Sequence, residues 1–112
     1  MLDDETKYSI KEVIEFCHEC EIQIIGRDKT RHFLYESGKT IDDLIDEIRS
    51  LRIEHQCCDP ELDYSPNHKG YVYQFKKVSF DKYWCYIKIK IKREKERIVA
   101  VLSFHKQEDS GS

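Results

Sequence analysis

The sequence predicts an α+β fold in which N-terminal helices pack on one face of an antiparallel β-sheet. Two observations support this prediction. Apolar residues recur at helical spacing in the first half of the chain, with one short β-branched run between them. After Gly70, apolar and polar residues alternate with the period of a β-strand in three successive segments. Successive strands joined by short connections pair antiparallel, and the helices then have one sheet to cover.

The composition is that of one folded domain. The chain has 112 residues, of which 39% are hydrophobic and 37% are charged. A chain of this length has room for one hydrophobic core. We therefore expect residues 1–112 to form a single domain, with mobile tails at 1–8 and 107–112. No apolar run is long enough to cross a bilayer and the N-terminus is acidic and polar, so we expect a cytoplasmic protein without a membrane partner.

The chain begins with a helix followed by a short strand. Ser9 starts the pattern S-I-K-E, a capping box in which the hydroxyl and the glutamate satisfy backbone N–H groups at a helix start. Apolar residues then recur at helical spacing, so residues 9–20 should be an amphipathic helix. Residues 21–25, EIQII, are rich in β-branched side chains and should form a strand that stops at Gly26.

Two more helices are predicted before the sheet. Asp28 is expected to cap the second, which runs to about residue 36, and Gly38 supplies the left-handed residue after its end. Thr40 opens the third, whose acidic first turn suits the positive end of the helix dipole. Its apolar stripe is the clearest in the chain and consists of Ile41, Leu44, Ile45, Ile48 and Leu51.

The remaining chain should be one long loop and three strands. Residues 54–70 contain both prolines and little periodicity, and we expect a loop, which at such a length is often functional. The strands are predicted at 71–78, 84–92 and 97–105, and the last two are joined by a solvated hairpin turn in KREKE.

Alternation along these strands separates a core face from an outer face, which the helices leave free. In the middle strand Cys85, Ile87, Ile89 and Ile91 should face the core. In the first strand Tyr73 and Phe75 are expected inside. In the last strand we predict Ile98, Ala100, Leu102 and Phe104 inside, and Val99, Val101, Ser103 and His105 outside. The outer face then carries Gln74, Lys76, Trp84, Tyr86, Lys88, Lys90 and His105.

The charge is divided between the two halves of the chain. Through residue 63 there are 8 Lys and Arg against 17 Asp and Glu, a net charge of −9, whereas residues 64–106 hold 11 against 3, a net charge of +8. The tail adds two acids, and the sum is −3. This asymmetry indicates that the basic half meets a polyanion. The alternative is that the two halves neutralise each other on one surface.

The groups of the outer face are those that RNA recognition and cleavage use. Ammonium groups bind phosphates, aromatic rings stack on unpaired bases, and amide or imidazole groups form hydrogen bonds. Cleavage without a metal requires deprotonation of the 2′-hydroxyl, protonation of the 5′-oxygen and stabilisation of charge on phosphorus. The alternative for the lysines is that they only solvate the sheet and discourage edge pairing.

The order of elements and three short motifs resemble the MqsR family of toxin mRNA interferases, a RelE-like group. The resemblance covers about residues 9–106. Its closest points are VYQ at 72–74, CYIKI at 85–89 and LSFHK at 102–106. It implies a RelE-like fold and the toxin of a toxin–antitoxin system. Such a toxin cleaves mRNA without a cofactor and is inhibited by a cognate antitoxin protein.

Carried over to this sequence, the resemblance implies catalytic roles for Gln74, Tyr86 and His105. The last of these stands where the family has a lysine, and an imidazole can transfer protons at neutral pH. We expect RNA to be bound by Lys76, Trp84, Lys88, Lys90 and Lys106. The family lysine after the third helix has no counterpart in residues 52–65, where the nearest candidates are His55 and Gln56. His55 and His68 lie in the long loop that could border the sheet face and are secondary loop candidates.

Two other functions are open. Cys17 and Cys20 have the C-x-x-C spacing of a zinc site, with Cys57 and Cys58 as further thiols. Cys17 lies on the apolar stripe of its helix, however, and the five cysteines without a secretion signal are expected as reduced thiols, with no metal bound. A non-catalytic RNA-binding or protein-interaction module on the same sheet would explain the missing loop lysine.

Overall fold

A computed structural model describes residues 7–57, 59–63, 70–80, 82–93 and 95–107 of the chain. Its helices are α1 (Ile10–Glu19), α2 (Asp28–Ser37) and α3 (Ile41–Arg49), with a short 3-10 helix at Ile53–His55. Its strands are β1 (Glu21–Ile24), β2 (Glu61–Asp63), β3 (Gly70–Phe80), β4 (Tyr83–Arg93) and β5 (Arg97–Lys106).

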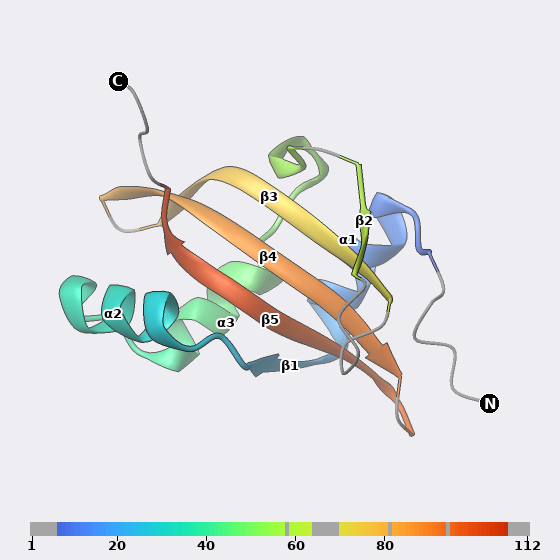
Figure 1. Cartoon of the computed structure of the whole chain (residues 1–112), viewed down its shortest axis with the longest axis horizontal. Helices are drawn as coiled ribbons and strands as arrows, with labels where there is room; N and C mark the ends of the chain where they lie inside the picture. The colour runs from blue at the N-terminus through green and yellow to red at the C-terminus, as the bar shows by residue number, and fades with distance from the viewer. Residues whose placement is uncertain (1–6, 58, 64–69, 81, 94, 108–112) are drawn as a thin grey trace.

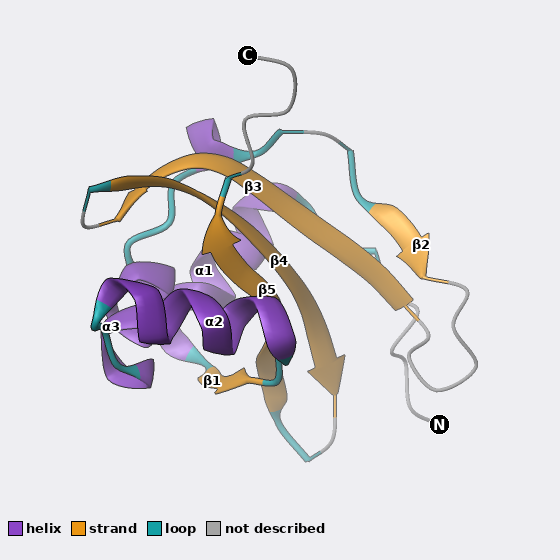
Figure 2. Cartoon of the chain, turned by 60° about the vertical axis from the view of Figure 1, so that its left-hand side comes forward, coloured by secondary structure: helices purple, strands orange, loops and turns teal. Residues whose placement is uncertain are grey.

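The strands form one sheet in the order β1-β5-β4-β3-β2 (Figure 1). Neighbouring strands from β5 to β2 are antiparallel, and β1 adds to β5 in parallel. The three helices gather on one side of the sheet (Figure 2). The predicted α+β class is therefore confirmed, with a parallel edge strand added to the antiparallel sheet.

The predicted helix caps are confirmed at Ser9 and Thr40 and wrong at Asp28. Ser9 and Thr40 each exchange two hydrogen bonds with the residue three positions later, which is a complete capping box. Gly38 follows α2 with a φ of 71°, in the left-handed region that favours glycine. Asp28 is the first residue of α2 and not its cap; the cap position falls on Arg27, whose side chain makes no capping bond.

The loop predicted at 54–70 contains ordered pairing along the edge of β3. Gln56 forms an isolated bridge with Phe75, and β2 pairs with β3 through residues 61–63. A strand as long as β3 exposes unpaired backbone groups at its edge, and these short segments supply partners for them. Residues 58 and 64–69 lie outside the described part of the chain.

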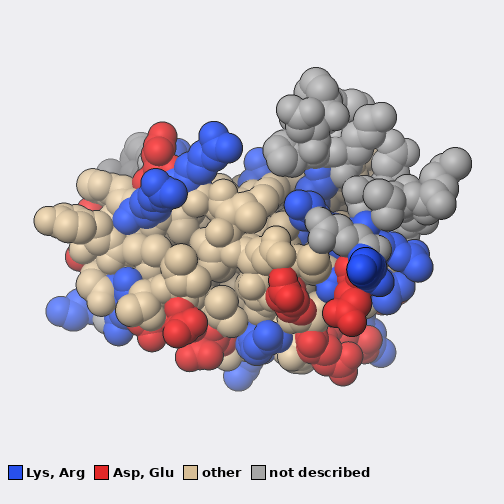
Figure 3. Space-filling model, turned by 90° about the horizontal axis from the view of Figure 1, so that it is seen from below, with Lys and Arg blue, Asp and Glu red and all other residues tan. Residues whose placement is uncertain are grey.

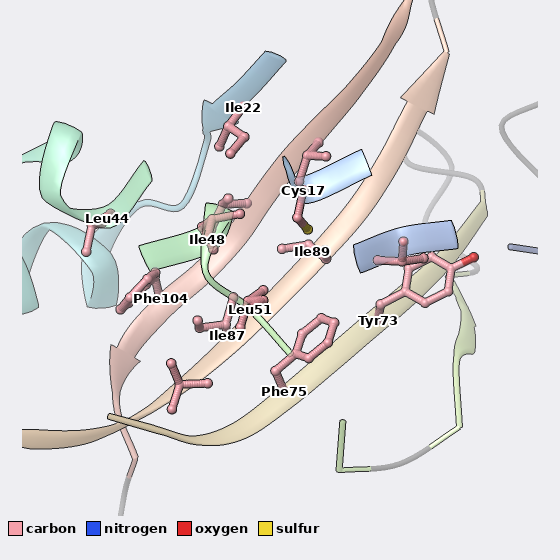
Figure 4. Packing of buried hydrophobic residues seen from close by; sticks show 14 of the residues in the cluster. Cys17, Ile22, Leu44, Ile48, Leu51, Tyr73, Phe75, Ile87, Ile89 and Phe104 are labelled. Atoms are coloured by element: carbon pink, nitrogen blue, oxygen red, sulfur yellow. The ribbon is translucent and has the colours of Figure 1, made fainter. Parts of the chain in front are cut away.

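The core lies between the helices and the sheet (Figure 4). Cys17 of α1, Leu44 and Ile48 of α3, and Phe75 and Phe104 of the sheet lose all or nearly all solvent contact there. Arg49 of α3 donates to three carbonyl oxygens at the C-terminal end of α1, at 3.1 to 3.2 Å, and so joins these two helices. Ile41 was expected in the apolar stripe, but it stands at the first position of α3 and remains 48% exposed.

A bulge in β5 overturns part of the predicted alternation. Lys88 of β4 pairs with Ser103, but the next residue, Ile89, pairs with Val101, so Leu102 is extra. One extra residue shifts the alternation by one position. Val99 and Val101, expected outside, are fully buried in the core, whereas Ile98 and Ala100, expected inside, pair with lysines of the outer face. Leu102 itself is only half-buried.

The bulge lies where β1 leaves β5 and α2 begins. The carbonyl of Val101 accepts hydrogen bonds from the amides of both Ile25 and Gly26, each at 3.0 Å. Beyond this point α2 lies beside β5 in the place of β1. The Oγ1 atom of Thr30 in α2 accepts a hydrogen bond from the backbone amide of Phe104 at 3.1 Å. A Cβ on Gly26 would collide with Thr30 and would stand 2.9 Å from the carbonyl oxygen of Leu102.

A second bulge, in β3, contains Lys76 and Lys77. Both lie between the paired residues Phe75 and Val78, and Lys77 has a φ of 56°. The amide of Lys77 donates to Oε1 of Gln107 at 3.1 Å, which ties the bulge to the end of β5. This bulge keeps both Phe75 and Val78 in the core, although they are three residues apart.

Residues 1–8 and 107–112 were expected to be mobile tails, and the structure shows contacts for Tyr8 and Gln107 at their inner ends. Tyr8 is 7% exposed, and its amide donates to the hydroxyl of Tyr73 at 2.7 Å. The amide of Gln107 donates to the carbonyl of Trp84 at 2.7 Å. Residues 1–6 and 108–112 lie outside the described part of the chain.

The outer face of the sheet is free only in part. Toward the β4–β5 hairpin its residues are buried, namely Val72, Lys90, Ile98 and Ala100. Toward the other end, residues 84, 86 and 88 of β4 are half-buried or exposed. The expectation of a wholly free face is corrected to an accessible area formed by this end of β3, β4 and β5, which we call the open end of the outer face.

Replacing Thr30 by valine should destabilise the protein, because the buried amide of Phe104 would lose its acceptor. We expect the free energy of unfolding in urea to fall by about 1–3 kcal/mol. Thr30→Ser is the matched control, since it keeps the hydroxyl and should retain most of that hydrogen-bond contribution. Equal losses in the two variants would contradict the role given to the hydroxyl.

The thiol of Cys17 should make the protein less stable at alkaline pH. Burial raises its pKa from an ordinary 9.0 to about 12. Above the ordinary value the unfolded chain releases this proton and the folded chain keeps it, so stability is full below about pH 9 and is lost as the pH rises. The stability advantage of wild type over Cys17→Ala should shrink by about 1.4 kcal/mol per pH unit in that window. A difference that does not change with pH would contradict this.

Candidate active site on the outer sheet face

The open end of the outer face carries its polar side chains in cross-strand rows. In one row Lys88 of β4 lies between Gln74 of β3 and Ser103 of β5. In the next row Tyr86 of β4 pairs with His105 of β5. All five residues are half-buried. The side chains at such positions interact, so the rows place an amide, an ammonium, two hydroxyls and an imidazole together.

The hydroxyl of Tyr86 donates a hydrogen bond to Oε1 of Gln74 at 2.7 Å. The two residues are diagonal neighbours across the β3–β4 pairing, since Gln74 stands opposite Lys88. The bond holds the phenol ring of Tyr86 in one orientation and leaves the Nε2 amide group of Gln74 as a donor. The amide can then donate to an anionic oxygen bound over the sheet.

The imidazole of His105 is oriented by its own strand. Its ring lies 5.4 Å from the ring of Tyr86, centroid to centroid, at an angle of 47°. Its Nδ1 is 2.9 Å from the carbonyl oxygen of Lys106. A carbonyl only accepts, so Nδ1 carries the hydrogen in this contact. In the neutral ring Nε2 then holds the lone pair, which makes His105 a potential base.

Three of the five residues expected to bind RNA belong to the open end of the outer face. Lys88 stands in the row of Gln74, and Lys76 is exposed in the bulge of β3. Trp84 pairs with Ser79, next to the hairpin that joins β3 and β4, and is 62% exposed. A tryptophan with this exposure offers a surface for stacking a base.

Lys90 and Lys106, the other two residues expected to bind RNA, do not lie at the open end of the outer face. Lys90 is 3% exposed and stands opposite Ala100 in the buried part of the outer face. Lys106 pairs with Cys85, a core residue, so its side chain leaves the strand on the opposite face from His105. Its ammonium lies 3.5 Å from a carboxylate oxygen of Glu36 and 5.6 Å from the ring of Tyr83.

The loop candidate His55 belongs to a segment that runs beside β3. His55 accepts a hydrogen bond at Nδ1 from the amide of Arg52, at 3.2 Å, and closes the 3-10 helix. Two residues later, the amide of Cys57 donates to the carbonyl of Gln74 at 3.3 Å. The loop therefore runs along the backbone of a candidate catalytic residue. His68 lies outside the described residues.

The cysteines do not converge on one place among the residues that the structure describes. Cys17 is in the core, Cys20 is half-buried at the end of α1, and Cys57 is exposed beside β3. In the described ranges no group of three His, Cys, Asp or Glu side chains could hold a metal ion. Cys58 lies outside them.

Acidic and basic side chains lie close together on part of the surface (Figure 3). The face seen from below in Figure 1 carries basic and acidic side chains interspersed (Figure 3). The ion pair between Glu36 and Lys106 also joins one half to the other. The Glu36–Lys106 pair is thus one contact in which the two halves neutralise each other.

The sequence interpretation did not select Ser103 or Glu36. Strand alternation placed Ser103 on the outer face, but a serine there is common and carries little signal. Glu36 pairs with a residue 70 positions later in the chain, and no local pattern indicates that contact.

Comparison with known proteins gives no relative. No family model, curated protein or solved structure matches the chain. Within the described residues, no helix is both long and apolar enough to span a membrane.

The neutral imidazole of His105 should carry its hydrogen on Nδ1. Two-dimensional ¹⁵N–¹H spectra of the histidine side chains, recorded at alkaline pH, distinguish the two tautomers. We expect the Nδ1–H pattern for His105, because the Lys106 carbonyl accepts only from that tautomer. The exposed His18 of α1 serves as the control. An Nε2–H pattern for His105 would contradict its assignment as a base through Nε2.

Proposed function

We propose that this protein is an endoribonuclease that cuts mRNA at the open end of the outer sheet face without a metal ion, as the toxin of a toxin–antitoxin pair. The observation that carries the proposal is the cluster of Gln74, Tyr86 and His105. An imidazole with an available nitrogen stands beside a phenol that is itself held by an amide. Proton transfer and charge stabilisation in RNA cleavage need these groups.

In the proposed reaction His105 is the base. Its Nε2 takes the proton of the 2′-hydroxyl, the 2′-oxygen attacks phosphorus, and the bond to the 5′-oxygen breaks. The products are a 2′,3′-cyclic phosphate and a 5′-hydroxyl end. We assign protonation of the leaving 5′-oxygen to the hydroxyl of Tyr86, whose single hydrogen turns from Oε1 of Gln74 to the 5′-oxygen when the substrate is bound. The Nε2 amide group of Gln74 and the ammonium of Lys88 stabilise the charge that develops on the phosphoryl oxygens.

Binding of the strand is assigned to the exposed groups around this cluster. Lys76 and Lys88 attract phosphates, and Trp84 stacks on an unpaired base. The reaction needs a 2′-hydroxyl with a freely adjustable backbone, which favours single-stranded RNA. In a toxin–antitoxin pair, the antitoxin would inhibit the enzyme by covering the same area, where Trp84 offers exposed aromatic surface.

A second candidate function is RNA binding without cleavage. The observation that favours it is that few of the predicted lysines lie near the cluster. Lys90 is buried, Lys106 is paired with Glu36, and residues 53–57 contain no lysine. This function predicts RNA binding that weakens with salt and forms no product.

Cleavage should depend on His105 and Tyr86. With purified protein, EDTA and single-stranded RNA, His105→Gln and Tyr86→Phe should each lower the initial rate by about 100-fold or more, because each removes a proton-transfer group. His18→Gln and Tyr35→Phe are matched controls on exposed helix positions and should cut at the wild-type rate. Mass spectrometry should find 2′,3′-cyclic phosphate ends.

Two results would contradict these assignments. Cleavage that survives both substitutions would reject the site. Salt-sensitive RNA binding without any product, in a protein whose unfolding is cooperative, would reject the enzyme in favour of the binding module. Growth arrest on induced expression, lost in the same two variants and kept in the controls, is the expected result in cells.

A further inference from the structure

Three side chains that donate hydrogen bonds stand in one row at the open end of the outer face. Gln74 of β3 and Ser103 of β5 are the partners of Lys88 on the two sides of β4, and all three residues are half-buried. An amide, an ammonium and a hydroxyl group thus follow one another across three strands. Each of these groups can donate to an anionic oxygen.

The row has the width of a bound phosphate. β3 and β5 are both neighbours of β4, so the backbones of Gln74 and Ser103 are roughly 10 Å apart. A phosphoryl group with one hydrogen bond on each side spans roughly 8 Å, because each bond adds about 2.8 Å to the width of the group. The long side chain of Gln74 and the short one of Ser103 can therefore reach the same phosphate.

The proposed acid and base lie on opposite sides of the middle strand. The phenol of Tyr86 leans from β4 toward β3, because its hydroxyl reaches Oε1 of Gln74 at 2.7 Å. His105 stands on β5. In-line displacement places the attacking and leaving oxygens on opposite sides of phosphorus. The phosphorus atom then lies above β4, where Lys88 stands.

The hydroxyl of Ser103 has no hydrogen-bond partner within the described part of the chain. In contrast, the hydroxyls of Ser9, Thr30 and Thr40 each accept from a backbone amide. Ser103 also stands two residues from His105 on the same face of β5, roughly 7 Å along the strand. Its hydroxyl can therefore donate to a phosphate whose sugar reaches His105.

The strands beneath the row carry no carboxylate. β3, β4 and β5 are described over their full length, and their residues include no Asp or Glu, whereas Lys or Arg occurs in each strand. Lys88 lies within the row, and Lys76 is exposed in the bulge two residues beyond Gln74. Such a surface attracts an anion.

The cavity beside His105 does not oppose this attraction. It is open, has a volume of about 530 Å³ and lies between α2 and the end of β5. Its lining contains two carboxylates, Asp28 and Glu36, and two ammonium groups, Lys29 and Lys106. Glu36 lies 3.5 Å from the ammonium of Lys106. The acids of α2 are therefore offset by cations of the same lining.

We propose that Ser103 is a further catalytic residue whose hydroxyl donates a hydrogen bond to a non-bridging oxygen of the scissile phosphate. With Gln74 and Lys88 it completes a row of donors that holds the phosphate, while Tyr86 and His105 in the next row transfer the protons. Ser103 keeps its hydrogen throughout, so the proton balance of the reaction is unchanged. The proposal rests on the proposed function for its RNA context.

The first test uses inorganic phosphate as the probe and needs no cleavage. Phosphate is titrated into ¹⁵N-labelled protein at constant ionic strength, and the amide shifts of residues 86–88 and 103–105 are followed. Ser103→Ala should weaken binding about tenfold or more, because a hydrogen bond to a charged group is lost. Ser103→Thr keeps the hydroxyl and should bind like wild type. Ser79→Ala, which removes an exposed serine of β3, is the matched control and should do the same.

The second test measures cleavage of single-stranded RNA under single-turnover conditions. Ser103→Ala should lower the rate about tenfold or more, because one donor to the transition state is lost. Ser103→Thr and Ser79→Ala should cut at the wild-type rate. The pH dependence of the rate should keep its shape in Ser103→Ala, since the hydroxyl transfers no proton.

Sulfur substitution at the cleaved bond identifies the contact itself. Two RNAs carry sulfur in place of one or the other non-bridging oxygen. For one of them, the sulfur should slow wild type more than it slows Ser103→Ala, because sulfur is the weaker acceptor for the hydroxyl. A purely structural role of Ser103 would leave the sulfur effects of the two proteins equal.

Three results would overturn the proposal: a phosphate affinity that Ser103→Ala does not change, shifts confined to other amides, or equal sulfur effects in wild type and variant. The two proposals also fail in different ways. Phosphate binding that depends on Ser103, with no RNA cleavage, would reject the ribonuclease and keep the phosphate site. Cleavage that depends on His105 and Tyr86 but not on Ser103 would reject the Ser103 contact and keep the ribonuclease.

Discussion

The double hydrogen bond at the carbonyl of Val101 is the contact on which the arrangement of the site depends. The amides of Ile25 and Gly26 converge on one oxygen, and at this point β1 leaves the sheet and α2 takes its place beside β5. The bulge at Leu102 lies at the same position. Because the alternation of β5 changes there, Val99 and Val101 enter the core on one side of the bulge and Phe104 enters it on the other. His105, next to Phe104, is thereby set on the outer face opposite Tyr86.

The candidate catalytic groups are held by the core beneath them. Ile87 and Phe104 are cross-strand partners with no solvent exposure, and they adjoin Tyr86 and His105 along their strands. Phe75 plays the same part beside Gln74. Side chains built on packed strands are placed more precisely than side chains on loops. The hydrogen bond from Tyr86 to Gln74 and the contact of His105 with the Lys106 carbonyl then restrict the remaining rotations.

Two consecutive residues at the end of β5 face different surfaces of the protein. His105 belongs to the outer face and also borders the cavity at α2, while the side chain of Lys106 lies wholly on the α2 side. The carbonyl of Lys106 orients the imidazole, and its ammonium pairs with Glu36. A ligand that moves Lys106 within the cavity would act on the backbone next to His105. The ion pair with Glu36 and the orientation of the His105 imidazole are therefore connected through one residue, Lys106.

Several local features of this protein follow from its sequence alone. The capping boxes at Ser9 and Thr40, the helix end at Gly38 and the outward direction of Tyr86 and Lys88 follow from residue types and periods within a few positions. Four other features became visible in the three-dimensional fold: the bulge at Leu102, the parallel addition of β1, the burial of Lys90 and the pairing of Lys106 with Glu36. Each of these depends on hydrogen bonds or packing between segments far apart in the chain, and a local period of apolar residues carries no information about such partners.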